Sequence, residues 1–165
     1  MTDGRAISAR MRPNGAESYF LAGQRCFYAA GEDRDYVSAY NWYAEAAKRG
    51  HAHAAYLCGY MLQTGMAGKV NLRKGNNFLK KAVAKNDVQA ILRLARNCFY
   101  GLGFQRNYKK AFDLWKKGTR LGCPEAEYYL GLCYQKGISV RPNAEKAKKH
   151  VSNACKNGFA FGELQ

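Results

Sequence analysis

The chain repeats itself with a fixed period of 36 residues. Small or turn-forming residues return at four separate phases of this period. These sets are Gly50, Asn86, Gly122 and Gly158; Ala46, Ala82, Gly118 and Ala154; Ala39, Gly75, Ala111 and Ala147; and Gly23, Gly59, Ala95 and Gly131. A constant period of this size is the sequence signature of a repeat array. Such arrays usually present extended surfaces that hold other molecules.

Each unit of the period reads as two amphipathic helices joined by a turn. In the third unit, one helical face carries Ala90, Ile91, Leu94, Ala95 and Cys98. Glycine then supplies the left-handed backbone that ends the first helix, at Gly31, Gly65, Gly101 and Gly137. The second helix is predicted to begin after a capping side chain, at Asp35, Asn71, Asn107 and Asn143.

Glycine in the middle of the first helix predicts a close contact between helices. Gly23, Gly59 and Gly131 each cost about 1 kcal/mol relative to alanine at such a position. We expect the paired helix to compensate by approaching closely, with the aromatic residue at the Trp42 position lying over the bare backbone.

The period divides the chain into a tail, four units and a short end segment. Residues 1–15 are predicted to form a flexible tail, and the units to span 16–51, 52–87, 88–123 and 124–159. Residues 160–165 re-enter the pattern of a first helix, so we expect them to start a fifth helix or to form a C-terminal cap.

A string of residues in the third unit resembles the Sel1-like repeat family, a relative of the tetratricopeptide repeat. The matching residues are Leu94, Ala95, Tyr100, Gly101, Gly103, Asn107, Tyr108, Lys110, Ala111, Trp115, Lys117 and Gly122. The resemblance implies an all-α fold, an α-solenoid of four helix-turn-helix repeats. It also implies a non-catalytic role as adaptor or scaffold in protein complexes, often in bacterial signalling or host contact. Some secreted relatives join their helices by a cysteine pair in every unit, and this chain lacks that pair.

Features of other protein classes are missing from the sequence. No apolar run approaches the roughly 18 residues of a membrane-spanning helix, and no secretory signal follows the arginines of the tail, so we expect a cytoplasmic protein. The six cysteines form no recurring pair and no CxxC, which favours reduced thiols over disulfides or zinc. His51 and His53 alone supply too few metal ligands. No catalytic motif occurs, so we predict no catalytic residue, no metal and no cofactor.

The first helix of each repeat offers a candidate groove. Positions expected to point outward carry Phe20, Gln24, Tyr56, Tyr60, Met61, Arg93, Arg96, Asn97, Tyr129 and Gln135. Aromatic residues and arginine are enriched at binding hot spots. From this set we predict a partner-binding site of Gln24, Tyr56, Tyr60, Arg93, Arg96, Asn97 and Tyr129. Arg93 and Arg96 lie about one helical turn apart, and arginine suits carboxylates, so the expected partner is an acidic protein or peptide.

Charge marks a second candidate surface. Residues 69–120 carry 14 basic and 2 acidic side chains, which accounts for +12 of the net charge of +15. A basic patch is predicted at Lys80, Lys81, Lys109, Lys110, Lys116 and Lys117, mostly on second helices. One interpretation is a solvated outer face. The alternative function is binding of nucleic acid or an anionic surface through the block 69–120.

The last second helix raises the question of association. Val151, Ala154 and Cys155 are predicted to leave a bare apolar face where the array ends, because a solenoid needs a polar cap at each end. We therefore expect self-association through the repeat ends.

Overall fold

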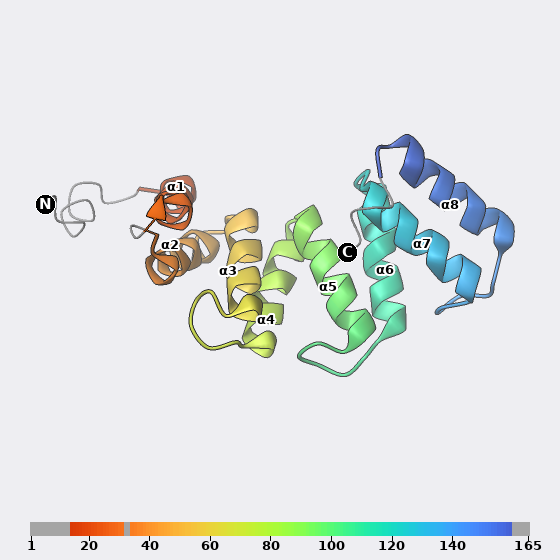
Figure 1. The fold of residues 1–165 in the computed structure, drawn as a ribbon, viewed down its shortest axis with the longest axis horizontal. Coiled ribbons are helices and arrows are strands. Elements are labelled where there is room, and N and C mark those ends of the chain that lie inside the picture. Colours follow the sequence, from red (N-terminus) through yellow and green to blue (C-terminus); the bar gives the residue numbers. More distant parts are fainter. Residues whose placement is uncertain (1–13, 32–33, 160–165) are drawn as a thin grey trace, which may run out of the picture. The chain divides into compact units, whose positions relative to one another are not determined.

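The structure is a computed structural model that describes residues 14–31 and 34–159. In these residues it contains eight α-helices of 13 residues each (Figure 1). The helices are α1 (Ala16–Tyr28), α2 (Tyr36–Lys48), α3 (Ala52–Thr64), α4 (Leu72–Ala84), α5 (Val88–Tyr100), α6 (Tyr108–Arg120), α7 (Pro124–Lys136) and α8 (Ala144–Lys156). The predicted all-α repeat fold is confirmed. The predictions for residues 1–13 of the tail and for 160–165 lie outside the described residues.

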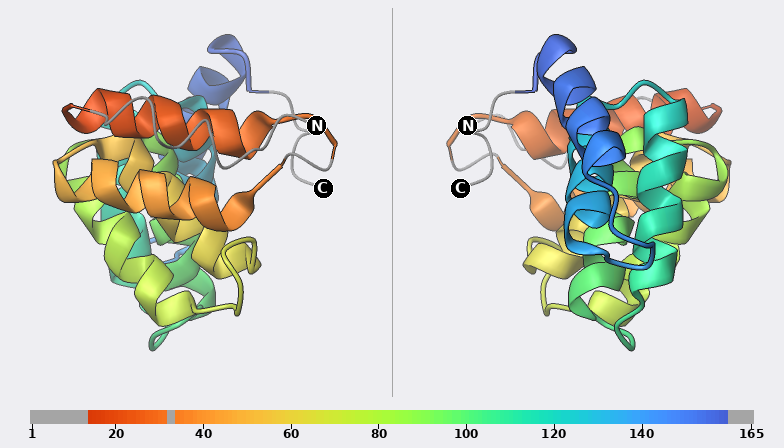
Figure 2. Two further views of the ribbon diagram at one scale, coloured as in Figure 1. Left: turned by 90° about the vertical axis from the view of Figure 1, so that its left-hand side faces the viewer. Right: turned by 90° about the vertical axis from the view of Figure 1, so that its right-hand side faces the viewer.

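The helices pack as consecutive pairs, one pair for each repeat (Figure 2). The chain divides into two compact units, residues 1–85 and residues 86–165, and each unit contains two repeats. In the first unit, α1 packs on α2 and α3 on α4, and α2 also packs on α3. In the second unit, α5 packs on α6 and α7 on α8, with α6 packed on α7.

Side-chain caps fix where the second helices begin. The side chains of Asp35, Asn71, Asn107 and Asn143 accept hydrogen bonds from backbone N–H groups three residues later, at 2.9, 2.9, 2.8 and 2.8 Å. Each bond satisfies one of the N–H groups that lack a partner within the helix. The four predicted caps are confirmed.

Three of the four first helices end at a glycine, as predicted. Gly65, Gly101 and Gly137 have φ values of 81°, 76° and 69°, which places them in the left-handed region. The first repeat differs, because the equivalent residue is Ala29 and its backbone is extended, with φ −55° and ψ 148°. The Cβ of alanine disfavours the left-handed conformation, so Gly31 does not cap α1 but takes a positive φ of 57° two residues later.

The mid-helix glycines are sites of close helix contact. A Cβ added at Gly23 would lie 2.5 Å from the ring of Tyr43, and one at Gly59 would lie 2.8 Å from Leu79. The close approach is therefore confirmed, but the predicted Trp42 is not the residue that covers Gly23. Trp42 packs instead on Tyr19, with ring centroids 5.8 Å apart. One residue of helix turns the side chain by about 100°, so an error of one position moves it off the contact.

Substitution of Gly23 by alanine should lower the free energy of unfolding by about 1–2 kcal/mol. The added methyl group would overlap the buried Tyr43 ring, which costs about 1–3 kcal/mol, while helix propensity returns up to about 1 kcal/mol. Urea unfolding of wild type and variant measures the difference. In a protein that already carries Tyr43→Leu, Gly23→Ala should lower the free energy of unfolding by less. An unchanged effect would contradict the contact between Gly23 and Tyr43.

The end of the array differs from the prediction of a bare apolar face. Ala154 is fully buried, and a methyl group of Val151 would lie 2.7 Å from a Cβ added at Gly131. Val151 is partly buried and lies beside Gly131 of α7, and only Cys155 of the predicted three is exposed. None of the six cysteines forms a disulfide. Within residues 14–31 and 34–159, no helix has both the length and the apolarity to cross a bilayer.

Candidate functional site

A cavity of about 160 Å³ lies in the second unit, bordered by α5, α6 and α7. Phe99 of α5, Trp115 of α6 and Tyr129 of α7 form its aromatic walls. Leu132 of α7 and Ile138, just beyond that helix, add aliphatic surface. We call this cavity the α5–α7 pocket. It is lined by two first helices, α5 and α7, and by the second helix α6.

Ring stacking fixes the shape of the pocket wall. Trp115 and Tyr129 stack with ring centroids 4.9 Å apart and planes inclined by 10°. The Phe99 ring lies 5.6 Å from Trp115 at an angle of 50°. Trp115 is only 2% exposed and therefore joins the pocket wall to the core of the unit. Burial, opposed by the nearby charge of Arg96, raises the pKa of the Tyr129 hydroxyl.

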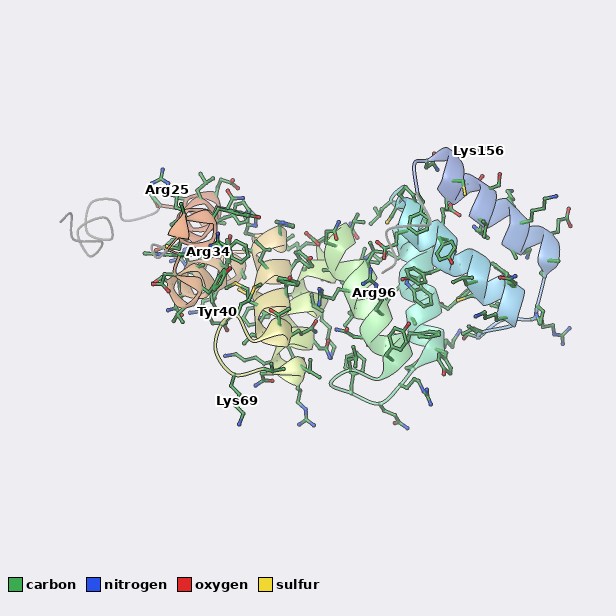
Figure 3. All side chains as sticks on the ribbon, in the orientation of Figure 1. Arg25, Arg34, Tyr40, Lys69, Arg96 and Lys156 are labelled. Carbon is green, nitrogen blue, oxygen red and sulfur yellow. The ribbon has the colours of Figure 1, made fainter. Side chains whose placement is uncertain are left out.

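Arg96 stands at the edge of the pocket and is held there by an ion pair. Its guanidinium donates to a carboxylate oxygen of Glu125 at 2.5 Å, and the Arg96 side chain is 46% exposed. Burial alone would lower the pKa of Arg96, but the hydrogen bond and charge of Glu125 outweigh this effect and raise it. Figure 3 shows Arg96 on the side of α5 nearest to α6 and α7. The guanidinium also forms a hydrogen bond with the Tyr129 hydroxyl, and its five N–H donors exceed these two partners.

Two further polar side chains complete the edge of the pocket. Tyr100 of α5 is 65% exposed, and Lys136 at the end of α7 is exposed as well. Among the residues that the structure describes, Lys136 makes no ion pair. The pocket thus combines an apolar, aromatic interior with two cationic groups at its edge.

The other predicted groove residues have different surroundings. Asn97 is only 4% exposed, so the structure places it in the interior and not on a surface. Arg93 is partly buried and does not line the α5–α7 pocket. Phe20 and Met61 are also buried, in the core of the first unit. These positions lie next to core positions on the helix, so a small error in the predicted helical phase assigns a buried side chain to the surface.

In the first unit, the predicted groove residues are partly exposed. Gln24 on α1 and both Tyr56 and Tyr60 on α3 have intermediate exposure. The two tyrosine rings lie 6.4 Å apart, at an angle of 31°. They belong to a different unit from Arg96 and Tyr129, which are the predicted residues that the structure brings together at one pocket.

The predicted basic patch is exposed and lies on second helices. Lys80 and Lys81 are on α4, and the other four lysines are on α6. Of the whole set, five are exposed and one is partly buried: Lys80, Lys81, Lys109, Lys110 and Lys116, and then Lys117. Lys80 and Lys81 therefore belong to the first unit, and the other four lysines belong to the second.

In the described part of the chain, no three His, Cys, Asp or Glu side chains gather as metal ligands. His51 caps α3, since its Nδ1 accepts a hydrogen bond from the N–H of Ala54 at 3.0 Å. Its ring also stacks on Phe20, with centroids 4.2 Å apart. His51 therefore has a structural role at the boundary between the first two repeats.

The comparison with protein families gives one repeated match. The Sel1 repeat family model matches residues 16–51, 52–87, 88–123 and 124–159. A curated relative, chitin synthase regulatory factor 3 of Schizosaccharomyces pombe, is 32% identical over 160 residues. The alignment covers 90% of this chain and 17% of the yeast protein, so the chain spans about a sixth of that relative's length.

Solved structures share the fold. A Sel1 repeat protein from Oxalobacter formigenes aligns with a TM-score of 0.86 and 23% identity, over 98% of this chain and 65% of that chain. A protective antigen of uropathogenic Escherichia coli strains, with an SLR fold, aligns with a TM-score of 0.84 and 24% identity, over 97% of this chain and 34% of the antigen. Proteins built from Sel1 repeats generally mediate protein–protein interaction or regulatory scaffolding. The present chain belongs to the Sel1 repeat family and is an all-α solenoid of four such repeats.

Proposed function

We propose that this chain is a non-catalytic protein-binding module that holds an acidic segment of a partner on the first helices of its repeats. The observation that carries the proposal is the α5–α7 pocket, where stacked aromatic rings lie beside Arg96 and Lys136. Tyrosine, tryptophan and arginine are the residues that dominate binding energy at protein interfaces. A concave apolar site with a few polar groups at its edge is also the usual form of a binding pocket.

The charge of the second unit supports an acidic partner. Residues 86–165 carry 14 basic and 6 acidic side chains, a net charge of +8. Such a field attracts anionic segments and speeds their encounter with the surface. Within it, the exposed guanidinium of Arg96 and the ammonium group of Lys136 offer short-range pairing with carboxylates.

The name of the fission yeast relative is consistent with a binding role. That protein is named a regulatory factor for chitin synthase, and it shares 32% identity with this chain over 160 residues. Repeat arrays of this kind present extended surfaces that bind other molecules. The identity of the partner does not carry over, because this chain spans 17% of the relative.

Selection from a random peptide library tests the proposal. The full chain is immobilised and panned against phage-displayed peptides, and the enriched sequences are synthesised and titrated. We expect these peptides to be rich in carboxylates and to bind the Arg96→Glu variant at least tenfold more weakly, since the substitution reverses a charge at the pocket. The matched control is Lys116→Glu, which reverses the charge of an exposed side chain on α6 and should change affinity little.

The alternative function rests on the exposed lysines of α4 and α6. Binding of nucleic acid through these side chains predicts an affinity that falls steeply with salt, with each phosphate contact adding about 0.9 to the logarithmic slope for double-stranded DNA. Lys109→Glu with Lys116→Glu would then abolish binding of a DNA duplex, and Arg96→Glu would have little effect. If Lys116→Glu and Arg96→Glu weaken the binding of the selected peptides equally, the proposal of a first-helix site is contradicted.

Self-association through the repeat ends is not part of the proposal. Of the apolar side chains that suggested it, Ala154 is fully buried and Val151 lies partly buried beside Gly131 of α7. The exposed residues of α8 are mostly polar or charged.

A further inference from the structure

We infer that the α5–α7 pocket receives one phenylalanine-sized aromatic side chain of the acidic partner, with a neighbouring carboxylate paired to Lys136. This inference rests on the proposed function and adds the chemistry of the ligand. It is supported by the size of the pocket, by the nature of its walls, and by a comparison between the two halves of the chain.

The volume of the pocket suits a single ring. A cavity of about 150 Å³ lined by apolar side chains binds benzene in a well-studied engineered protein, and the pocket here measures about 160 Å³. The walls supply Phe99, Trp115 and Tyr129, and aromatic rings favour one another in offset-stacked or edge-to-face arrangements. A flat aromatic side chain is therefore a better occupant than a branched aliphatic one of similar volume.

The repeat period provides an internal comparison, because positions 72 residues apart are equivalent in the two units. The pocket residues Leu132, Cys133 and Ile138 correspond to Tyr60, Met61 and Met66 in the first unit. There, Met61 is fully buried, and both Tyr60 and Met66 pack against the core cluster.

The side chains at equivalent positions differ in size between the units in both directions. Two of the three replacements enlarge the side chain, from leucine to tyrosine and from cysteine to methionine. At two other lining positions the second unit has the larger side chain, Trp115 where the first unit has Tyr43 and Tyr129 where it has Leu57. The pocket of the second unit is therefore lined by a set of side chains that the first unit does not carry.

The charges at the edge differ between the units in the same way. Arg96 corresponds to Gln24, and Lys136 corresponds to Thr64. Arg96 and Lys136 are thus cations at the edge of the pocket that the first unit lacks at the equivalent positions. A ligand that combines an apolar ring with negative charge fits both the aromatic walls and these cations.

The two cations have unequal roles. Arg96 already holds Glu125 at 2.5 Å, which restrains its guanidinium beside the pocket. Lys136 is exposed and makes no ion pair within the described ranges 14–31 and 34–159. A carboxylate next to the bound ring would find its partner in Lys136, with Arg96 adding a further positive charge at the opposite helix.

Three short peptides test the inference on the full chain. The probes are acetylated, amidated Glu-Glu-Phe-Glu-Glu, the same peptide with alanine in place of phenylalanine, and Lys-Lys-Phe-Lys-Lys. The Trp42→Phe variant leaves Trp115 as the only tryptophan, so its fluorescence reports on the pocket wall. We expect the acidic phenylalanine peptide to change this fluorescence and to bind roughly ten- to a hundredfold more tightly than the alanine peptide. The lysine peptide should not bind.

Variants that place first-unit residues at the equivalent pocket positions provide the matched test of the pocket. Leu132→Tyr with Cys133→Met fills the space with residues that the chain already accepts at the equivalent positions. It should reduce the affinity for the phenylalanine peptide to that for the alanine peptide. Lys136→Thr should weaken the binding of both acidic peptides. Lys109→Thr, which changes an exposed side chain on α6, should weaken the binding of neither. Circular dichroism and thermal unfolding verify that each variant is folded.

The outcomes separate the inference from the proposed function. Equal binding of the phenylalanine and alanine peptides, or tight binding of phenylalanine to the filled variant, would overturn the inference. If library-selected peptides still depend on Arg96 in that case, the proposed function stands without it. If the affinity of those peptides is unchanged in Arg96→Glu, the proposed function is wrong, and the inference that rests on it is wrong as well.

Discussion

Replacement of Trp115 by alanine should lower the free energy of unfolding by about 3–5 kcal/mol, the usual cost of deleting a buried aromatic side chain. Trp115 is 2% exposed and contacts both Tyr129 and Phe99 through its ring. Its loss leaves a cavity that joins the existing α5–α7 pocket, so the surrounding helices can recover little of the lost contact. Urea unfolding, followed by circular dichroism at 222 nm, measures the effect.

The matched control is the other tryptophan of the chain. Trp42 is partly exposed and packs on Tyr19 with centroids 5.8 Å apart, so Trp42→Ala should cost much less than Trp115→Ala. Native-state hydrogen exchange adds a location to the measurement, because Trp115→Ala should reduce protection in α5, α6 and α7 first. Equal destabilisation by the two substitutions would contradict the role of Trp115 in the core of the second unit.

Alkaline pH should destabilise the protein through its buried thiols. Burial raises the pKa of Cys58 to about 12 and that of Cys133 to about 11, from an ordinary value of 9.0. Above pH 9.0 the unfolded chain loses these protons while the folded protein keeps them, so the folded state binds more protons and stability falls as pH rises. Below pH 9.0 the two thiols contribute no pH dependence. Each thiol can contribute at most about 1.4 kcal/mol per pH unit within its window.

Cysteine variants isolate this effect from the titration of other groups. The free energy of unfolding is measured between pH 8 and pH 11, with Cys58→Ala, Cys133→Ala and Cys155→Ala compared with wild type. The first two variants should flatten the decline, since they remove the buried thiols. Cys155 is exposed, so its variant should follow the wild-type curve. Parallel curves for all four proteins would show that buried thiols do not set the alkaline limit.

The repeat period made much of the fold predictable. Gly65, Gly101 and Gly137 end their helices in the left-handed region because glycine alone adopts it freely. Asn71 and the other three capping residues begin the second helices because their short side chains reach the N–H group three residues later. These are local effects that depend on neighbouring residues in the sequence, so a pattern of residue types was enough to find them.

The errors arose where three-dimensional packing decides. Sequence spacing pointed to Trp42 over Gly23, but the contact belongs to Tyr43, because a shift of one residue rotates a helical side chain by about 100°. For the same reason Asn97 is buried although the pattern placed it on the surface. The C-terminal end of α1 also differs, because the first repeat has Ala29 where the other three repeats have a capping glycine. This difference is visible in the sequence itself.

The candidate site was only half visible in the sequence. Arg96 and Tyr129 were predicted, while Phe99, Trp115 and Lys136 were missed as members of the same pocket. Trp115 and Lys136 differ from their equivalents 72 residues earlier, Tyr43 and Thr64, whereas Phe99 matches Phe27. A residue type alone does not show whether a neighbouring side chain fills the space beside it. That question is settled by the distance between α5 and α7, which depends on packing throughout the second unit.

The central claim is that a partner binds at the pocket between the first helices and not on the lysine surface of the second helices. The most direct measurement is a titration of the isotopically labelled full chain with the Glu-Glu-Phe-Glu-Glu peptide, followed by ¹H–¹⁵N correlation spectra. We predict chemical-shift changes in α5 and α7, at Arg96, Tyr129 and Lys136 and their neighbours. Changes confined to α4 and α6, around Lys80, Lys109 and Lys116, would contradict the claim.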